Sequence, residues 1–99
     1  MYRGTTPQLK FKISIPVDTL IEAYITFVQD GENVLEKTLA DCDKHSDTLE
    51  LRLTQDDTLK FKGDRFVEVQ IRAKTRGGDA VASKIMKTYA SRILKDGVI

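Results

Sequence analysis

The only cysteine and the only histidine of the chain, Cys42 and His45, lie three positions apart in the segment DCDKHSD. A thiol and an imidazole can act as a nucleophile and its base, or as two metal ligands. A Cys–His catalytic pair also needs an orienting group and an oxyanion hole, and a structural zinc site needs four ligands, usually Cys or His. The segment supplies neither set. Its composition therefore favours a solvated polar turn that spans residues 41–47.

Three acids of the same segment, Asp41, Asp43 and Asp47, resemble the start of a calcium-binding loop. Such a loop needs a glycine at its sixth position and a bidentate glutamate at its twelfth. Those two positions hold Ser46 and Arg52. An acidic turn exposed to water is therefore favoured over a calcium site.

Other sequence patterns give no stronger indication of catalysis. Gly77-Gly78 is followed by neither a lysine nor a helix start, so we expect a turn there rather than a phosphate-binding loop. A Ser/His/Asp triad would have to use His45, which has no supporting motif. We therefore assign no catalytic, metal-ligating or cofactor-binding residue, and we expect that the chain is not an enzyme and uses no cofactor.

Charge is unevenly distributed along the chain, although the formal net charge is only +1. Residues 1–16 carry three bases and no acid, residues 17–57 carry eleven acids and three bases, and residues 58–99 carry ten bases and four acids. Adjacent acidic and basic strands that neutralise each other are the favoured interpretation. The alternative is a nucleic-acid-binding stripe, for which strands near Arg72 and Lys84 would have to pair. The candidate bases are Lys60, Lys62, Arg65, Arg72, Lys74, Arg76, Lys84 and Lys87.

Length and composition fit one globular domain, residues 1–99, with 40% hydrophobic and 31% charged residues. No apolar stretch approaches the roughly 20 residues that a membrane span needs. The first residues, Met1 to Gly4, show no apolar core of a secretory signal. A single cysteine suggests folding in a reducing compartment, so we expect a cytoplasmic protein when it is made.

Alternation of apolar and polar residues predicts the strands that would position these side chains. The clearest case is residues 48–54, and Asp30-Gly31 predicts a hairpin with a loop from Asp30 to Asn33. The predicted strands are residues 8–15, 23–29, 34–40, 48–54, 67–74 and 80–90. The residues expected to face the core are Leu9, Phe11, Ile13, Ile15, Ala23, Ile25, Phe27, Leu49, Leu51, Leu53, Val67, Val69, Ile71 and Ala73.

Eleven residues, 54–64, do not follow the alternation of apolar and polar residues that marks the strands on either side of them. Thr54 followed by Asp57 resembles a capping box with Asp in place of Glu, and acids in a first helical turn suit the helix dipole. Leu59 and Phe61 would anchor the segment in the core, and Gly63 would release the chain into the next strand. We expect one helical turn, residues 55–60, on a crossover between two layers.

The predicted fold class is all-β: an immunoglobulin-like Greek-key β-sandwich of about six to seven strands, with the helical turn at the crossover. Residues 41–47 are expected to give only a hairpin-length link between strands 34–40 and 48–54. Residues 80–90 are expected to form one returning strand, and the tail, residues 91–99, a short helical turn ended by Gly97.

Several segments resemble short prophage-encoded proteins of Gram-positive bacteria, and also the N-terminal immunoglobulin-like domain of some phage baseplate and tail proteins. The segments are YRGTTP, YITFVQDGENVLEKTL, LTQDDTLKF, VQIRAK and LKDGVI, which span almost the whole chain. The resemblance implies a β-sandwich with a structural or assembly role and carries over no catalytic residue. The tryptophan and the cysteine pair of immunoglobulin domains are absent.

Three hypotheses for function follow. The first is a non-enzymatic phage structural or assembly module that contacts other phage proteins or copies of itself, and so could be a virion component. The second is a small nucleic-acid-binding module that uses the basic second half. The third is a carbohydrate-binding module, against which the expected shortage of exposed aromatic residues argues. No membrane partner is expected.

Overall fold

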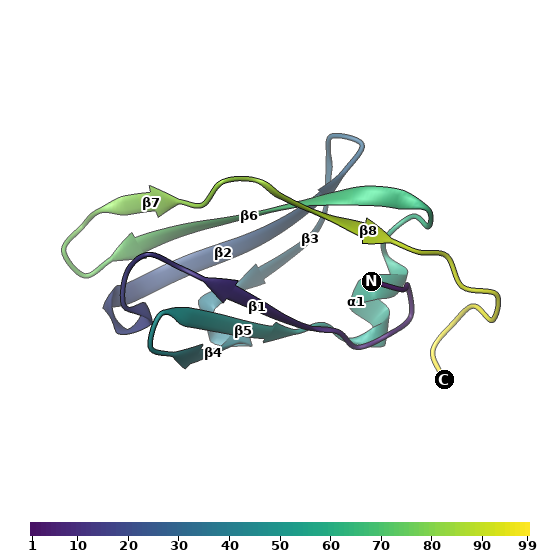
Figure 1. Cartoon of the computed structure of the whole chain (residues 1–99), viewed down its shortest axis with the longest axis horizontal. Coiled ribbons are helices and arrows are strands. Elements are labelled where there is room, and N and C mark those ends of the chain that lie inside the picture. The colour runs from purple at the N-terminus through teal and green to yellow at the C-terminus, as the bar shows by residue number, and fades with distance from the viewer.

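The protein, described for residues 1–99 by a computed structural model, consists of two antiparallel β-sheets that face each other (Figure 1). The smaller sheet has the strand order β1-β5-β4, and the larger has the order β3-β2-β6, with β7 and β8 both paired to the far side of β6. The strands are β1 (Gln8–Lys12), β2 (Leu20–Gln29), β3 (Glu32–Thr38), β4 (Cys42–His45), β5 (Thr48–Arg52), β6 (Arg65–Thr75), β7 (Ala80–Ala82) and β8 (Met86–Ala90). The helices are η1 (Val17–Thr19), η2 (Leu39–Asp41) and α1 (Gln55–Leu59).

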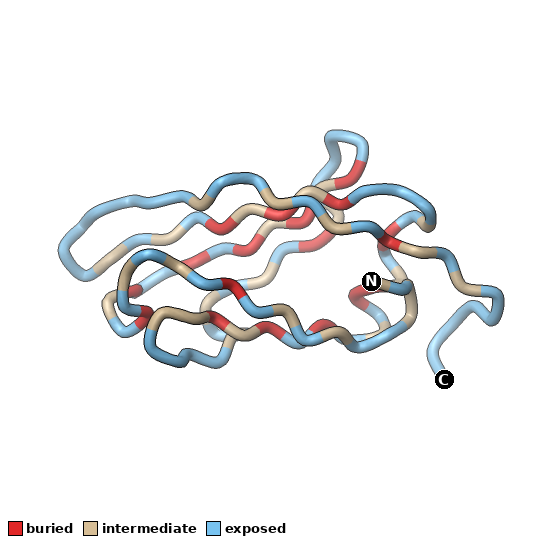
Figure 2. Tube along the Cα trace, in the orientation of Figure 1, coloured by how far each residue is buried: buried red, intermediate tan, exposed pale blue.

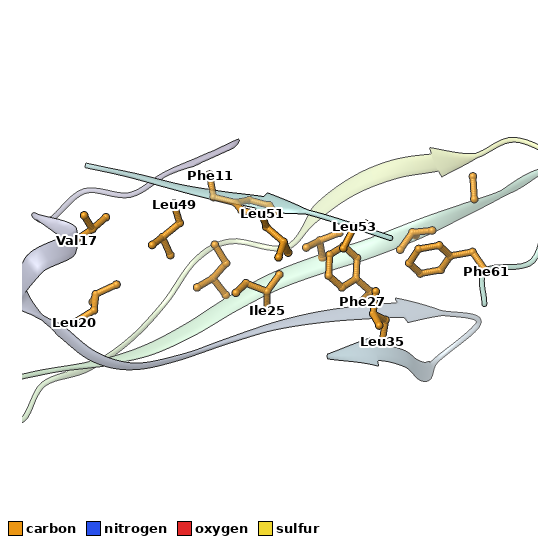
Figure 3. Close-up of a cluster of buried hydrophobic side chains, with 14 residues drawn as sticks. Phe11, Val17, Leu20, Ile25, Phe27, Leu35, Leu49, Leu51, Leu53 and Phe61 are labelled. Carbon is orange, nitrogen blue, oxygen red and sulfur yellow. The ribbon is translucent and has the colours of Figure 1, made fainter. Parts of the chain in front are cut away.

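A cluster of 14 buried apolar residues fills the space between the sheets (Figures 2 and 3). Leu49 and Leu51 of β5, with Leu53 just beyond it, face Ile25 and Phe27 of β2, as the alternation predicted. Each large apolar side chain that leaves water contributes about 1.5–3 kcal/mol to folding. Of the other residues expected to face the core, Leu9, Ile13, Ile15 and Ala73 are only half-buried. β1 ends at Lys12 rather than at the predicted residue 15, so Ile13 and Ile15 follow the strand.

The β2–β3 hairpin turns at Asp30 and Gly31, as the sequence predicted. Their φ angles are 51° and 78°. A two-residue turn with φ positive at both positions matches the right-handed twist of its strands, and Gly and Asp tolerate that conformation. The loop is shorter than predicted, because β3 already begins at Glu32.

The region 41–47 is where the prediction of a polar turn is wrong. Cys42–His45 forms strand β4, which pairs with β5 through a turn at Ser46 and Asp47. The chain therefore crosses from the larger to the smaller sheet at η2, and residues 34–40 and 48–54 are not hairpin partners. β4 is a short edge strand with one half-buried apolar residue, Cys42, so it lacks the alternation that marks a buried strand.

The crossover between β5 and β6 forms the predicted helical turn, α1. Thr54 Oγ1 accepts a hydrogen bond from the Asp57 N–H at 3.1 Å, and the Asp57 carboxylate accepts one from the Thr54 N–H at 2.9 Å. The capping box is thus confirmed. Phe61 is buried against Phe27, with ring centroids 5.8 Å apart. Buried Gln29 holds the far end of the crossover, accepting from the Lys62 N–H and donating to its carbonyl.

Residues 80–90 form two strands rather than the single predicted one. At the break, the Ser83 N–H donates to the Ile71 carbonyl at 2.9 Å, and Ser83 Oγ accepts from the Ile71 N–H at 3.0 Å. One serine thus satisfies the backbone of β6 where the edge strand bends away. Because Ser83 fits the alternating pattern of a strand, the sequence gives no sign of the break between β7 and β8.

The tail forms no helical turn, which corrects the prediction for residues 91–99. Its end is held by Gln55 of α1, which accepts from the Ile99 N–H at 2.9 Å and donates to the Ile99 carbonyl at 3.1 Å. Gly97 has a φ of 86°, but no helix precedes it. None of the helices has the length and apolar character needed to cross a bilayer.

Candidate interaction surface

The structure does not bring Cys42 and His45 together. They are an odd number of residues apart on β4, so their side chains point to opposite faces of the sheet. Cys42 is half-buried with its Sγ 3.6 Å from the Thr38 carbonyl, and burial raises the pKa of its thiol. His45 is exposed, with Nε2 3.6 Å from a Glu50 carboxylate oxygen.

The three acids of this region also separate. The Asp41 carboxylate accepts the Thr38 N–H at 2.8 Å and so caps η2. Asp47 lies 3.8 Å from Lys12, and Asp43 lies opposite Glu50 in the sheet. No group of three His, Cys, Asp or Glu residues is arranged to hold a metal ion.

The strands near Arg72 and Lys84 pair, as the alternative of a basic stripe requires, because β6 and β7 form a hairpin in which Arg72 is opposite Ala82. Arg72 and Lys74 line a hollow of about 410 Å³ on the outer face of the larger sheet, together with Glu22 and Glu36. Lys84 instead lines a separate hollow of about 280 Å³ between the ends of β1 and β7. In the first hollow, the Tyr24 hydroxyl donates to Glu22, and this hydrogen bond raises the pKa of the tyrosine.

Acids and bases from distant parts of the chain do meet in several places. Arg65 lies 2.6 Å from Asp30, and Lys10 lies 3.9 Å from Glu50. In the larger sheet, Glu22 pairs in register with Lys74. Part of the charge asymmetry in the sequence is thus neutralised by adjacent strands.

Exposed aromatic side chains gather on the outer face of the larger sheet. Tyr2, Phe66 and Tyr89 are 60%, 62% and 41% exposed, and we call these three residues the aromatic surface. Phe66 and Tyr89 stack edge to face, with ring centroids 5.2 Å apart. Contrary to the expected shortage, four of the seven aromatic residues are exposed, since Tyr24 is as well. Three exposed aromatics on one face make a candidate binding surface.

Pairing within the sheet positions the aromatic surface. Phe66 and Tyr89 are directly opposite each other in β6 and β8. Tyr2 forms a parallel bridge to Ser91, two residues after Tyr89, so its side chain lies on the same face.

The predicted strand began at Val67 and so missed Phe66. Extending its alternation backwards by one residue would have placed Phe66 on the outer face.

The amino-terminal segment and the tail close the end of the molecule beside α1. Arg3 donates to the Phe61 carbonyl at 2.6 Å and to the Leu59 carbonyl at 3.0 Å, so its guanidinium caps the last turn of the helix. Buried Thr58 donates to the Thr5 carbonyl at 2.8 Å. Three of the segments that carry the family resemblance therefore meet at this end: residues 2–7, 53–61 and 94–99.

Comparison with known proteins gives no match: no family model, no curated protein and no solved structure is significantly similar to this chain.

Proposed function

We propose that this chain is a non-enzymatic structural or assembly module that makes protein–protein contacts, of the kind found in phage baseplates and tails. The aromatic surface carries the proposal. Tyrosine and phenylalanine are enriched at protein interfaces, where a few aromatic anchors supply most of the binding energy. Phe66 and Tyr89 lie on strands of a packed sheet, so they lose little conformational freedom when a partner covers them.

The strand order supports an immunoglobulin-like Greek-key arrangement as part of this proposal. In that fold one sheet holds strands B, E and D and the other holds C′, C, F and G. The order β1-β5-β4 corresponds to B-E-D, and the order β3-β2-β6 with β7 and β8 corresponds to C′-C-F-G. Residues 1–3 lie beside the end of β8 rather than beside β1, so no strand A covers the smaller sheet.

The test is binding to the purified protein products of the genes that neighbour this one. We expect one of them to bind, and the double variant Phe66→Ala/Tyr89→Ala to weaken its binding by about 30-fold or more, the size of a hot-spot effect. Tyr24→Ala is the matched control and should bind like the unaltered chain. Tyr24 is an exposed aromatic residue on the same face, but it is opposite Arg72, six residues along β6 from Phe66. The proposal fails if no such protein binds, or if the double variant binds as well as the control while keeping the same melting temperature.

A further inference from the structure

The two sides of the molecule, where the edge strands of both sheets lie, carry net charges of opposite sign. β1 carries Lys10 and Lys12, and residues 80–90 carry Lys84 and Lys87, with no acid in either segment. We call these two segments the basic edge. Residues 32–45, which form β3, η2 and β4, carry four acids and two lysines, a net charge of −2, and we call them the acidic edge.

The strand orders place these two edges on opposite sides of the molecule. β1 and β4 are the two outer strands of the smaller sheet, while β3 lies at one edge of the larger sheet and β7 and β8 lie at the other. The ends of β1 and β7 border the same hollow, so the basic segments lie on one side (Figure 1). η2 joins β3 to β4 in three residues, which keeps the acidic segments together on the other side.

We propose that copies of this chain associate head to tail, with the basic edge of one copy against the acidic edge of the next. This names the partner for the assembly role proposed above, on which it rests. β1 and β4 both run antiparallel to β5, so they run in the same direction. Translation of one copy onto the next would therefore pair β1 with its neighbour's β4 as parallel strands.

The cross-strand register places the charges suitably for this pairing. Lys10 and Asp43 lie in one row, since both are opposite Glu50. When β1 of one copy pairs with β4 of the next, this row continues across the contact, and Lys10 of the first copy lies beside Asp43 of the second. The acidic edge also has two lysines. Lys37 is already held by Asp57 at 3.1 Å, and Lys44 is opposite Leu49, so its side chain lies on the other face of the sheet from Asp43.

The same charges disfavour a two-fold dimer. Pairing β1 with β1 of a second copy would place lysines against lysines, and pairing β4 with β4 would bring the Asp43 carboxylates together. Like charges directly opposite each other destabilise a strand pair. The contact is therefore heterologous, which closes into a ring or continues as a filament.

Edge lysines also have a purely protective interpretation, because charged edge strands resist pairing with other chains. Salt dependence separates the two interpretations. Association between opposite charges weakens as salt is added, whereas relief of lysine repulsion would strengthen association. The mass of the protein in solution at low and high salt therefore distinguishes them.

The experiment measures mass by sedimentation over a range of concentrations. We expect the unaltered chain at low salt to grow beyond two copies, and salt to reverse this growth. Lys10→Glu and Asp43→Lys should each weaken association about tenfold or more, because like charges then meet at the contact. An equimolar mixture of the two variants should recover association, because each then offers the other an opposite charge. Lys95→Glu and Asp56→Lys, which change exposed residues on neither edge, are the matched controls for charge.

Lys10→Gln adds no repulsion with Glu50 and provides the test if Lys10→Glu does not fold. The proposal is overturned if the unaltered chain stays a single copy at low salt or stops at two copies. It is also overturned if added salt promotes association, or if the mixture fails to recover it. None of these variants alters the aromatic surface, so failure here leaves the binding test of Phe66 and Tyr89 intact.

Discussion

The Lys37 ammonium lies 3.1 Å from the Asp57 carboxylate and ties the edge strand β3 to the crossover helix α1. The Asp57 side chain is only 7% exposed and that of Lys37 is 21% exposed. The same carboxylate accepts the Thr54 N–H. Asp57 therefore has two structural roles at once, since it caps a helix and holds a strand of the opposite sheet.

Replacing Asp57 by Asn should lower the free energy of unfolding by about 1.5–3 kcal/mol, the range for hydrogen bonds to charged groups. The substitution keeps the size of the side chain but leaves Lys37 without its counter-charge. Urea unfolding measures the change. Asp56→Asn, an exposed neighbour, is the control and should stay within about 0.5 kcal/mol. Equal effects of the two substitutions would show that the ion pair contributes nothing.

Stability should also fall in acid because of Asp57. Burial alone would raise its pKa, but the Thr54 N–H, the hydrogen bond from Lys37 and the Lys37 charge together lower it. A lowered pKa in the folded state gives stability that is fully present above the ordinary pKa of about 3.9 and is lost as the pH falls through the folded value. The difference in unfolding free energy between the unaltered chain and Asp57→Asn should thus shrink below about pH 4. A constant difference would contradict this assignment.

Arg3→Ala should destabilise the end of the molecule by about 1.5–3 kcal/mol, because the carbonyls of Leu59 and Phe61 lose a charged donor. Arg3→Lys should recover little of this, since an ammonium cannot reproduce the fork that reaches both carbonyls. Thermal melting gives the comparison. Arg92→Ala removes an exposed arginine paired with Asp64 and serves as the control, with an expected loss of less than about 1 kcal/mol.

Gly63→Ala should cost about 1–3 kcal/mol through overpacking. An added Cβ would lie 2.8 Å from the Arg92 Cβ and 3.0 Å from its Cα, so backbone would have to move. Gly77→Ala is the matched control, because its Cβ would meet nothing closer than 3.7 Å and its φ is not positive. That control should be neutral or slightly stabilising. Similar melting temperatures for both variants would show that Arg92 moves at little cost.

The Cys42 thiol should react slowly with iodoacetamide at neutral pH. Burial raises its pKa, with smaller contributions from Asp41 and Asp43, and only the thiolate reacts. Labelling followed by mass spectrometry should show the rate rising as the pH is increased, and labelling in urea should be faster. Rapid labelling of the folded chain at pH 7 would contradict the burial of the Cys42 thiol.

Segments with strict alternation and the crossover could be predicted from sequence, because their determinants are local. A period of two identified the buried faces of β2, β5 and β6, and the spacing of Thr54 and Asp57 identified the cap of α1. β4 could not be found in this way. It is held by its pairing with β5 and has almost no buried side chain of its own.

The candidate surfaces depend on contacts between distant residues, which local patterns do not reveal. Nothing near Tyr2 in the sequence indicates that it will lie beside Ser91. The same holds for the partner of Asp57, since Lys37 precedes it by 20 positions and the chain changes sheets at η2 between them. The charge asymmetry was visible in the sequence, but its division between opposite edges required the strand order.

The parallel bridge between Tyr2 and Ser91 has a mechanical consequence. The Arg3 N–H donates to the Ser91 carbonyl, and the Ser91 N–H donates to the Met1 carbonyl. Because the two segments run in the same direction, a pulling force applied to the two ends of the chain loads these bonds in shear. Bonds loaded in shear must rupture together, whereas bonds that are unzipped break one at a time. Once the hydrogen bonds between Ile99 and Gln55 have broken, stretching the chain from its ends should therefore meet resistance at residues 1–3 before either sheet begins to open.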